Sequence, residues 1–150
     1  MRLPVSLCLI AGAVTCFESS FYPIKGSSQD QSSFANVDYI RTTDFNLTLD
    51  VDFDKTVIQG TNTLTLTAVR DVTEIVLDYQ GLYIESASYS NTNLSTGFID
   101  AFFETQTDSQ LGSALRVFMT DKARPTDVVI LRVQFYTTNQ SLAINWLTKE

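Results

Sequence analysis

Strict alternation between apolar and polar residues is the feature that most constrains how this 150-residue chain can fold. From position 45 to position 53 every odd residue is apolar, and the even residues between them are Asn, Thr or Asp. Successive side chains of a β-strand point to opposite faces of a sheet, so this pattern predicts a strand with one buried face and one solvated face. The apolar positions are Phe45, Leu47, Leu49, Val51 and Phe53.

A second alternating run follows the short turn at Asp54 and Lys55. Two such runs joined by a short turn predict an antiparallel hairpin. Gly60 interrupts the second run, which predicts a bulge or a close approach between strands rather than a binding site. Within residues 57–69 threonines occupy one face, and the apolar face consists of Ile58, Leu64, Leu66 and Ala68.

Further short apolar segments, separated by turn-like residues, continue along the chain, and no window predicts a long amphipathic helix. About seven short strands at this spacing predict an all-β fold, namely an antiparallel β-sandwich or an open barrel. The additional strands are expected at residues 74–77, 82–89, 97–104, 115–119 and 128–136.

The composition restricts the chemistry available to the chain. It contains no histidine, which is the commonest general base at neutral pH and the commonest metal ligand. Both cysteines, Cys8 and Cys16, lie in the first segment, so the body of the protein has no thiol. The net charge of −7 repels phosphate backbones. We therefore expect no catalytic, cofactor-binding or metal-binding residue in this chain, and no nucleic-acid partner.

The first segment has the layout of a secretory signal peptide. Arg2 precedes an apolar run over residues 3–17, and the sequence becomes polar at Glu18. This run is too short for a stable membrane span. Two other interpretations are a lipoprotein lipidated at Cys16 and a buried N-terminal helix.

Signal cleavage sets the expected domain boundaries. We place the cut after Cys16, with Ser19 or Ser20 as alternatives, and expect a protein that is secreted or lies in the lumen of the secretory pathway. The residues that follow are rich in Ser, Gln, Asp and Gly, which predicts a flexible leader. The boundaries are 1–16 for the signal peptide, 17–37 for the leader and 38–150 for the β domain.

Three Asn-x-Ser/Thr sequons support this secretory interpretation and predict N-glycosylation. They begin at Asn46, Asn93 and Asn139.

The last residues, 143–150, form an apolar segment without a stop-like turn. We expect a β domain that is truncated and incomplete at its C-terminus, with unpaired strand edges that favour marginal stability or self-association.

Two clusters of charged residues are candidate ion sites. Asp50, Asp52 and Asp54 supply carboxylates for a calcium ion, but their spacing lacks the glycine and the terminal glutamate of a calcium loop. A solvated face that ends in a turn is therefore favoured. The second cluster is a candidate anion patch, for which ordinary loop solvation is the favoured interpretation, and it consists of Arg116, Lys122 and Arg124.

The aromatic residues of the later strands are candidates for a carbohydrate platform. Core positions and ordinary sheet-surface positions are the favoured interpretation. The residues concerned are Tyr79, Tyr83, Tyr89, Phe102, Phe103, Phe118 and Phe135.

A family resemblance is carried by four segments that follow one another along the chain. They are residues 39–54, 58–66, 75–84 and 141–150. Together they resemble the N-terminal domain of the M1 family of zinc aminopeptidases, and most closely its leukotriene A(4) hydrolase branch. The most specific piece is the Ala-x-x-Trp-Leu-Thr sequence at 143–148, followed by the first hairpin. The resemblance extends over residues 30–150.

The resemblance implies a saddle-like β-sandwich that packs against a thermolysin-like catalytic domain and helps to wall the peptide-substrate cleft. It implies zinc in that catalytic domain, held by a His-Glu-x-x-His helix, and a substrate amine held by a Gly-x-Met-Glu-Asn strand. Neither motif occurs in this chain. No functional residue carries over, so we expect a chain without catalytic activity of its own.

The activity of the parent protein remains open at this point. The resemblance implies zinc-dependent removal of N-terminal residues from peptides, opening of an epoxide, or both. The alternative function is a stand-alone secreted β-sandwich that binds protein or carbohydrate.

Overall fold

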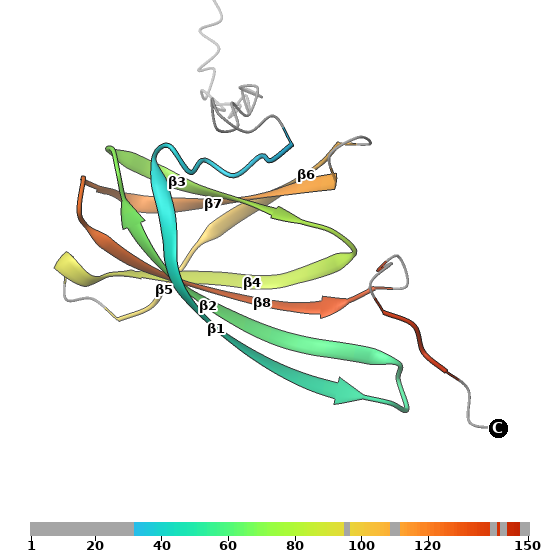
Figure 1. Cartoon of the computed structure of the whole chain (residues 1–150). Helices are drawn as coiled ribbons and strands as arrows, with labels where there is room; N and C mark the ends of the chain where they lie inside the picture. The colour runs from blue at the N-terminus through green and yellow to red at the C-terminus, as the bar shows by residue number, and fades with distance from the viewer. Residues whose placement is uncertain (1–31, 95–96, 109–111, 139–140, 142–143, 148–150) are drawn as a thin grey trace, which may run out of the picture.

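Two antiparallel sheets face each other in the computed structural model, which describes residues 32–94, 97–108, 112–138, 141 and 144–147 (Figure 1). The large sheet has the strand order β1-β2-β8-β4-β5, and the small sheet has the order β3-β7-β6. Every pairing is antiparallel, so the predicted β-sandwich is confirmed. The elements are β1 (Ile40–Asp52), β2 (Val57–Ala68), β3 (Val72–Tyr79), β4 (Leu82–Asn91), the 3-10 helix η1 (Thr92–Leu94), β5 (Ile99–Asp100), β6 (Phe102–Asp108), β7 (Gly112–Ala123) and β8 (Val128–Thr137).

The segment predicted as one strand at 97–104 is two strands in different sheets. β5 pairs with β4 in the large sheet, whereas β6 pairs with β7 in the small sheet. Ala101 lies between them and donates its backbone N–H to the carbonyl of Ala87 at 2.9 Å. The alternation breaks at the adjacent Phe102 and Phe103, so no single sheet face accommodates the whole segment.

The hydrophobic core lies between the small sheet and one half of the large sheet. Apolar residues recur at every second position on the facing sides of β2, β8 and β7, as a buried sheet face requires. The largest fully buried side chains are Leu66, Ile75, Tyr89, Val117, Val129 and Leu131.

Tyr89 links the two sheets through a polar contact inside this core. Its ring is fully buried, and its hydroxyl donates to Asp121 Oδ1 at 2.6 Å. The same hydroxyl oxygen accepts the backbone N–H of Thr120 at 2.9 Å. Because Tyr89 is on β4 and its partners are on β7, this contact fixes how the sheets sit on each other.

A short segment before β1 covers the outer edge of β3. The Asn36 side chain is buried and donates to the carbonyl of Glu74 at 2.9 Å, while Val76 donates its N–H to Asn36 Oδ1 at 3.0 Å. Ser33 and Phe34 both donate to the Asp78 carboxylate. Residues 17–31 of the predicted leader lie outside the described residues, as does the predicted signal peptide at 1–16.

Candidate functional site

The apolar residues at positions 45–53, on β1 and in the turn that follows it, do not form the buried face that their alternation predicts. Their exposed fractions run from 41% to 77%, so that prediction is wrong. β1 and β2 reach beyond the small sheet, and no described element lies over this half of the large sheet (Figure 1). We call this surface the bare face, and it consists of Phe45, Leu47, Leu49, Val51 and Phe53.

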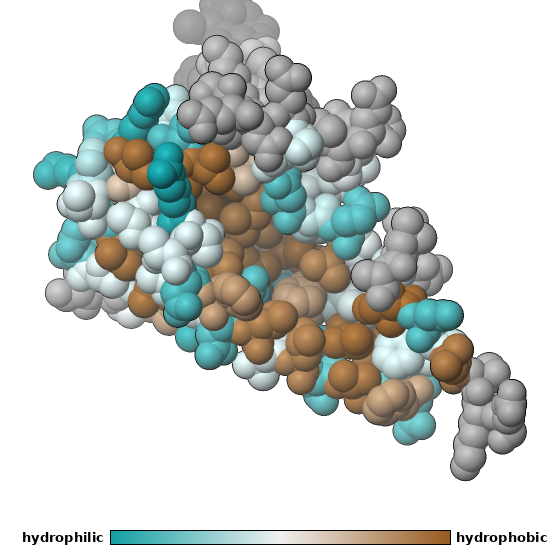
Figure 2. Space-filling view, in the orientation of Figure 1, coloured by the Kyte–Doolittle hydropathy of each residue, from teal (hydrophilic) through white to brown (hydrophobic). Residues whose placement is uncertain are grey.

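The bare face is a direct continuation of the core. Directly paired residues of antiparallel strands share one face of the sheet. Phe45 pairs with Leu64, which is buried in the core and pairs in turn with Leu131 of β8. Figure 2 shows apolar side chains gathered in a band that runs toward the β1–β2 end of the molecule. The same sheet face is therefore covered at one end and exposed at the other.

Gly60 allows two apolar side chains to meet over the backbone of β2. A Cβ atom at this position would lie 2.5 Å from Cζ of Phe135 and 2.9 Å from Cδ2 of Leu49. The close approach at Gly60 is made by the side chains of Leu49 and Phe135 on the two neighbouring strands, and the register shift between β1 and β2 lies elsewhere, between Thr42 and Asp44. Gly60 thus removes a side chain that would divide the bare face from Phe135.

Asn62 is a polar residue within this apolar surface. It pairs with Leu47 on one side and with Val133 on the other, so its side chain lies on the same face as theirs. Its Oδ1 atom is buried and has no hydrogen-bond partner within the described part of the chain. A buried acceptor without a hydrogen bond lowers the stability of the folded state. A second layer over this surface would remove that cost if it supplied a donor to Asn62 Oδ1.

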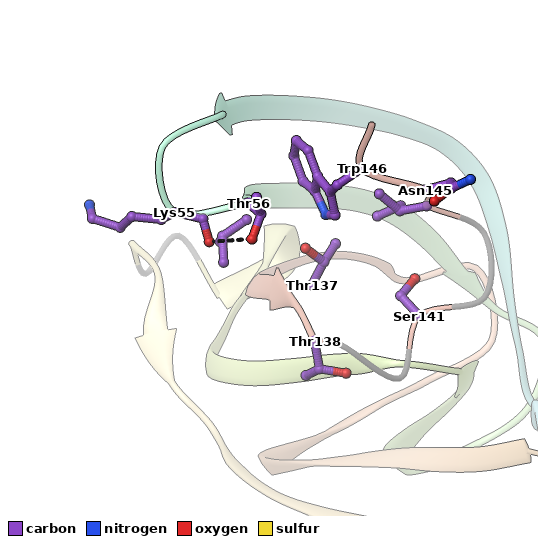
Figure 3. Close-up of a pocket in the computed structure, with 9 residues that line it drawn as sticks. Lys55, Thr56, Thr137, Thr138, Ser141, Asn145 and Trp146 are labelled. Carbon is purple, nitrogen blue, oxygen red and sulfur yellow. Dashed lines mark hydrogen bonds between the residues drawn. The ribbon is translucent and has the colours of Figure 1, made fainter. Parts of the chain in front are cut away.

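A cleft of about 450 Å³ lies at the tip of the β1–β2 hairpin. The hairpin turn forms one wall, the end of β8 another, and the segment around Asn145 the third (Figure 3). The Trp146 ring meets the Phe53 ring edge-on, with centroids 5.9 Å apart. The cleft therefore joins the bare face at Phe53.

The hydroxyl groups of the three threonines that line the cleft hydrogen-bond to backbone groups. Thr137 Oγ1 accepts the N–H of Ile58 at 3.0 Å, Thr138 Oγ1 donates to the carbonyl of Gly81 at 3.1 Å, and Thr56 Oγ1 donates to the carbonyl of Lys55. The titratable side chain in the lining is that of Lys55. Among the lining residues that the structure describes, none is a His, Cys, Asp or Glu that could serve as a general base or as an activated thiol.

Lys55 is paired with one carboxylate of the predicted calcium cluster. Its Nζ lies 3.0 Å from Asp52 Oδ2, and its backbone N–H donates to Asp52 Oδ1 at 2.9 Å. The backbone N–H bond, followed by the side-chain bond, lowers the pKa of Asp52, and the same carboxylate raises the pKa of Lys55. Among the described residues no group of three or more His, Cys, Asp or Glu is placed to hold a metal ion, so Asp50, Asp52 and Asp54 do not form one.

The predicted anion patch is divided among ion pairs. Arg116 Nη2 lies 2.6 Å from Glu74 Oε2, and Lys122 Nζ lies 2.9 Å from Asp71 Oδ2. Two of its three cations are thus neutralised by carboxylates of the same molecule. The favoured interpretation, ordinary surface charge, fits this arrangement.

The candidate carbohydrate aromatics do not share one surface. Tyr89 is in the core, and Tyr79, Phe103 and Phe135 pack against the core. Tyr83 stacks on Tyr136 in the large sheet, with ring centroids 4.6 Å apart, whereas Phe102 stacks on Phe118 in the small sheet at 5.6 Å. The described structure therefore places these residues as core and sheet-surface aromatics.

The asparagines of two of the three sequons fall within the described residues. Asn46 is exposed on β1, on the face opposite to the bare face, as predicted. Asn93 is exposed in η1, where its side-chain amide donates to Asp127 Oδ1. Asn139 lies outside the described residues, as do Cys8 and Cys16. Across the residues that the structure describes, no helix is long and apolar enough to cross a membrane.

Comparisons with known proteins point in one direction. The sequence model of the peptidase M1 N-terminal domain family matches residues 41–145. The leucine aminopeptidase 2 of Pyricularia oryzae is 27% identical over 124 residues, which make up 81% of this chain and 19% of that protein.

Solved structures agree with this match. The structure of native yeast LTA4 hydrolase is similar with a TM-score of 0.63 and 25% identity, over 81% of this chain and 18% of the yeast chain. The M1 zinc metallopeptidase of Deinococcus radiodurans has the same fold, with a TM-score of 0.50 and 19% identity, over 67% of this chain and 21% of its own. The chain thus spans about a fifth of the length of these relatives.

Proposed function

This chain belongs to the peptidase M1 N-terminal domain family over residues 41–145, and we propose that it acts as the non-catalytic N-terminal domain of an M1-type zinc aminopeptidase, where it helps to wall the peptide-substrate cleft. The observation that carries the proposal is the bare face. A contiguous apolar surface of this kind on a folded domain marks a site of interaction. The proposed occupant is the remainder of an M1 protein, beginning with the catalytic domain.

The chemistry of the bare face supports a protein layer as its occupant. A second layer over these five large apolar side chains would contribute a stabilising free energy of about 25 cal/mol for each Å² of apolar surface that it removes from water. Asn62 Oδ1 gains a hydrogen bond if that layer supplies a donor such as a backbone N–H. The cleft at Trp146 opens beside this surface, which makes it the part of the chain best placed to face a bound peptide.

Catalysis and zinc binding are assigned to another part of the parent protein. The residues of this chain do not fit a zinc site, because it has no histidine and its described residues contain no group of three potential ligands. The parent reaction is proposed to be the removal of N-terminal residues from peptides, as the name of the leucine aminopeptidase relative suggests. Epoxide hydrolysis is the second candidate, since the yeast relative is an LTA4 hydrolase.

The proposed location is the secretory pathway. The sequence supports a signal peptide at residues 1–16 and glycans at the three sequons, with exposed Asn46 the best placed of the two described ones. The alternative function, a stand-alone secreted module for protein or carbohydrate, is favoured by one feature, the open cleft beside the Trp146 indole.

The native mass of the protein tests the proposal. The chain, tagged and expressed in its own host, is expected in a species several times heavier than its 16.7 kDa, with zinc in that species. A glycosylated protein near the mass of one chain and free of zinc supports the stand-alone module instead.

A matched pair of variants locates the contact. Leu47→Lys places a charge on the bare face and is expected to lower the melting temperature of the heavy species. Gln59→Lys places the same charge on the exposed opposite face of the neighbouring strand and is expected to leave that melting temperature unchanged. An equal effect of both variants contradicts docking through the bare face.

A further inference from the structure

Among the residues that the structure describes, the outer edge of β1 is the longest strand edge without a pairing strand. β1 is the terminal strand of the large sheet and contributes 13 residues, and positions 41–51 are all exposed. The other terminal strands are shorter, with two residues in β5 and seven in β6, while β3 is covered by the segment around Asn36. β1 also contains no Lys and no Pro, the residues that commonly block strand edges.

We propose that this edge pairs with the same edge of a second copy of this chain, in an antiparallel arrangement about a two-fold axis at Leu49. A two-fold axis brings one strand against itself in the antiparallel direction, so a single strand supplies both halves of the interface. The large sheets of the two copies then form one continuous sheet. This inference concerns the backbone edge of β1 and does not rest on the proposed docking of the bare face.

The side chains of β1 select this register. With the axis at Leu49, apolar residues meet apolar residues: Leu49 faces Leu49 of the second copy, and Leu47 faces Val51. On the opposite face Thr48 lies across from Asp50, and Asn46 lies across from Asp52. Each acid thus meets a neutral side chain that can donate a hydrogen bond, and residues 46–52 of each copy are paired.

Neighbouring registers place like charges together or leave apolar residues unmatched. With the axis at Thr48, Asp44 meets Asp52, and with the axis at Leu47, Asp44 meets Asp50, in both cases within β1. With the axis at Leu49, Asp44 lies across from Asp54, which is in the turn beyond the end of β1 and outside the paired residues. Like charges directly opposite each other destabilise a strand pair. A shift by a single residue between the copies places the apolar face of one strand beside the polar face of the other. The register at Leu49 is therefore the one that β1 favours.

The test uses substitutions at Thr48, because this side chain is on the face opposite to the bare face. Thr48→Lys places a cation across from Asp50 of the second copy, and Thr48→Asp places an acid there, each twice because of the symmetry. Analytical ultracentrifugation of the full chain is expected to show a dimer that Thr48→Lys tightens and Thr48→Asp weakens, each by about three- to tenfold in dissociation constant. Opposite signs at one position do not arise from a loss of folding.

The protein for this test is made in the bacterial cytosol, where the sequon at Asn46 carries no glycan. Thr73 is the control position, an exposed threonine on β3 of the other sheet. Thr73→Lys and Thr73→Asp are expected to leave the dimer constant unchanged. A monomer at every concentration, or equal shifts from the Thr48 and Thr73 variants, overturns the proposal.

A thiol cross-link checks the register independently. In a chain with Cys8→Ser and Cys16→Ser, Leu49→Cys is expected to form a covalent dimer rapidly with a short bifunctional maleimide. Leu47→Cys should react slowly, since in this register the two copies of residue 47 are four residues apart along the strand pair. Equal cross-linking at the two positions excludes the register at Leu49.

Discussion

The two halves of the large sheet carry the same kind of side chain and bury it to very different extents. Leu131 in the covered half has no exposed surface, whereas Leu47 in the bare half is 46% exposed. Both lie on the same face of the same sheet. The difference comes from the small sheet, which lies over one half and not over the other. Burial of an alternating strand is therefore decided by the layer across from it, and not by the strand itself.

The largest difference between the two halves is expected when a leucine in each is replaced by alanine. Leu131→Ala leaves a cavity in the core and is expected to lower the free energy of unfolding by about 2–5 kcal/mol. Leu47→Ala removes a half-exposed side chain and is expected to cost less than about 1 kcal/mol. Urea unfolding followed by circular dichroism measures both values. Similar losses at the two positions would show that the bare half is covered in solution.

The covered half also depends on the polar contact between the sheets. Tyr89→Phe keeps the ring in the core and removes the hydroxyl, so Asp121 loses one of its hydrogen bonds and the backbone N–H of Thr120 loses its acceptor. We expect a loss of about 1–3 kcal/mol in the free energy of unfolding. Tyr83→Phe, at an exposed tyrosine of the same strand, is the control and should change stability by less than about 0.5 kcal/mol.

The next largest loss of stability is expected at the edge of β3 that the segment around Asn36 covers. Asn36→Ala removes the two hydrogen bonds that its side chain makes to Glu74 and Val76, and is expected to cost about 1–2 kcal/mol. Faster amide hydrogen exchange at Val76 should accompany this loss. An unchanged exchange rate at Val76 would mean that other groups protect this edge.

The smallest effect is expected at the hairpin turn of the bare half. Because its pKa is lowered on folding, Asp52 stabilises the folded state above its ordinary pKa of 3.8, and this contribution is lost as the pH falls through the folded value. Asp52→Asn should lower the Tm slightly at neutral pH and not at strongly acidic pH. The paired Lys55 has a raised pKa, so its contribution disappears only as the pH rises past 10.5 and through the folded value. A Tm difference that persists in strong acid would contradict this account.

Much of the fold could be predicted from local patterns. The alternation at residues 57–69 correctly placed Leu64, Leu66 and Ala68 on the core face, and Gly60 correctly marked a close approach. The division of residues 97–104 was missed, although the adjacent Phe102 and Phe103 were a signal that alternation fails there. The alternation of apolar and polar residues predicts which side chains share a face of a sheet. It indicates that the chain moves from one sheet to another only where the alternation is interrupted.

The bare face could not be predicted in the same way. The pattern of residues 45–53 is that of an ordinary half-buried strand, and the extent of the opposing sheet is set by pairings between distant segments such as β3 and β7. The contact between Phe53 and Trp146 likewise joins residues 93 positions apart. By contrast, the absence of histidine, the commonest general base at neutral pH, is read directly from the sequence.

The corner at Ala101 bears on how the molecule opens. Between β5 and β6 the chain passes from the large sheet to the small sheet through the single residue Ala101. Its backbone N–H donates to the carbonyl of Ala87. A one-residue connection cannot extend to span a larger distance. The two sheets therefore cannot separate while β5 and β6 both stay paired. The two sheets should therefore open as a single cooperative unit, whereas the β1–β2 tip, over which no described strand lies, should fray independently.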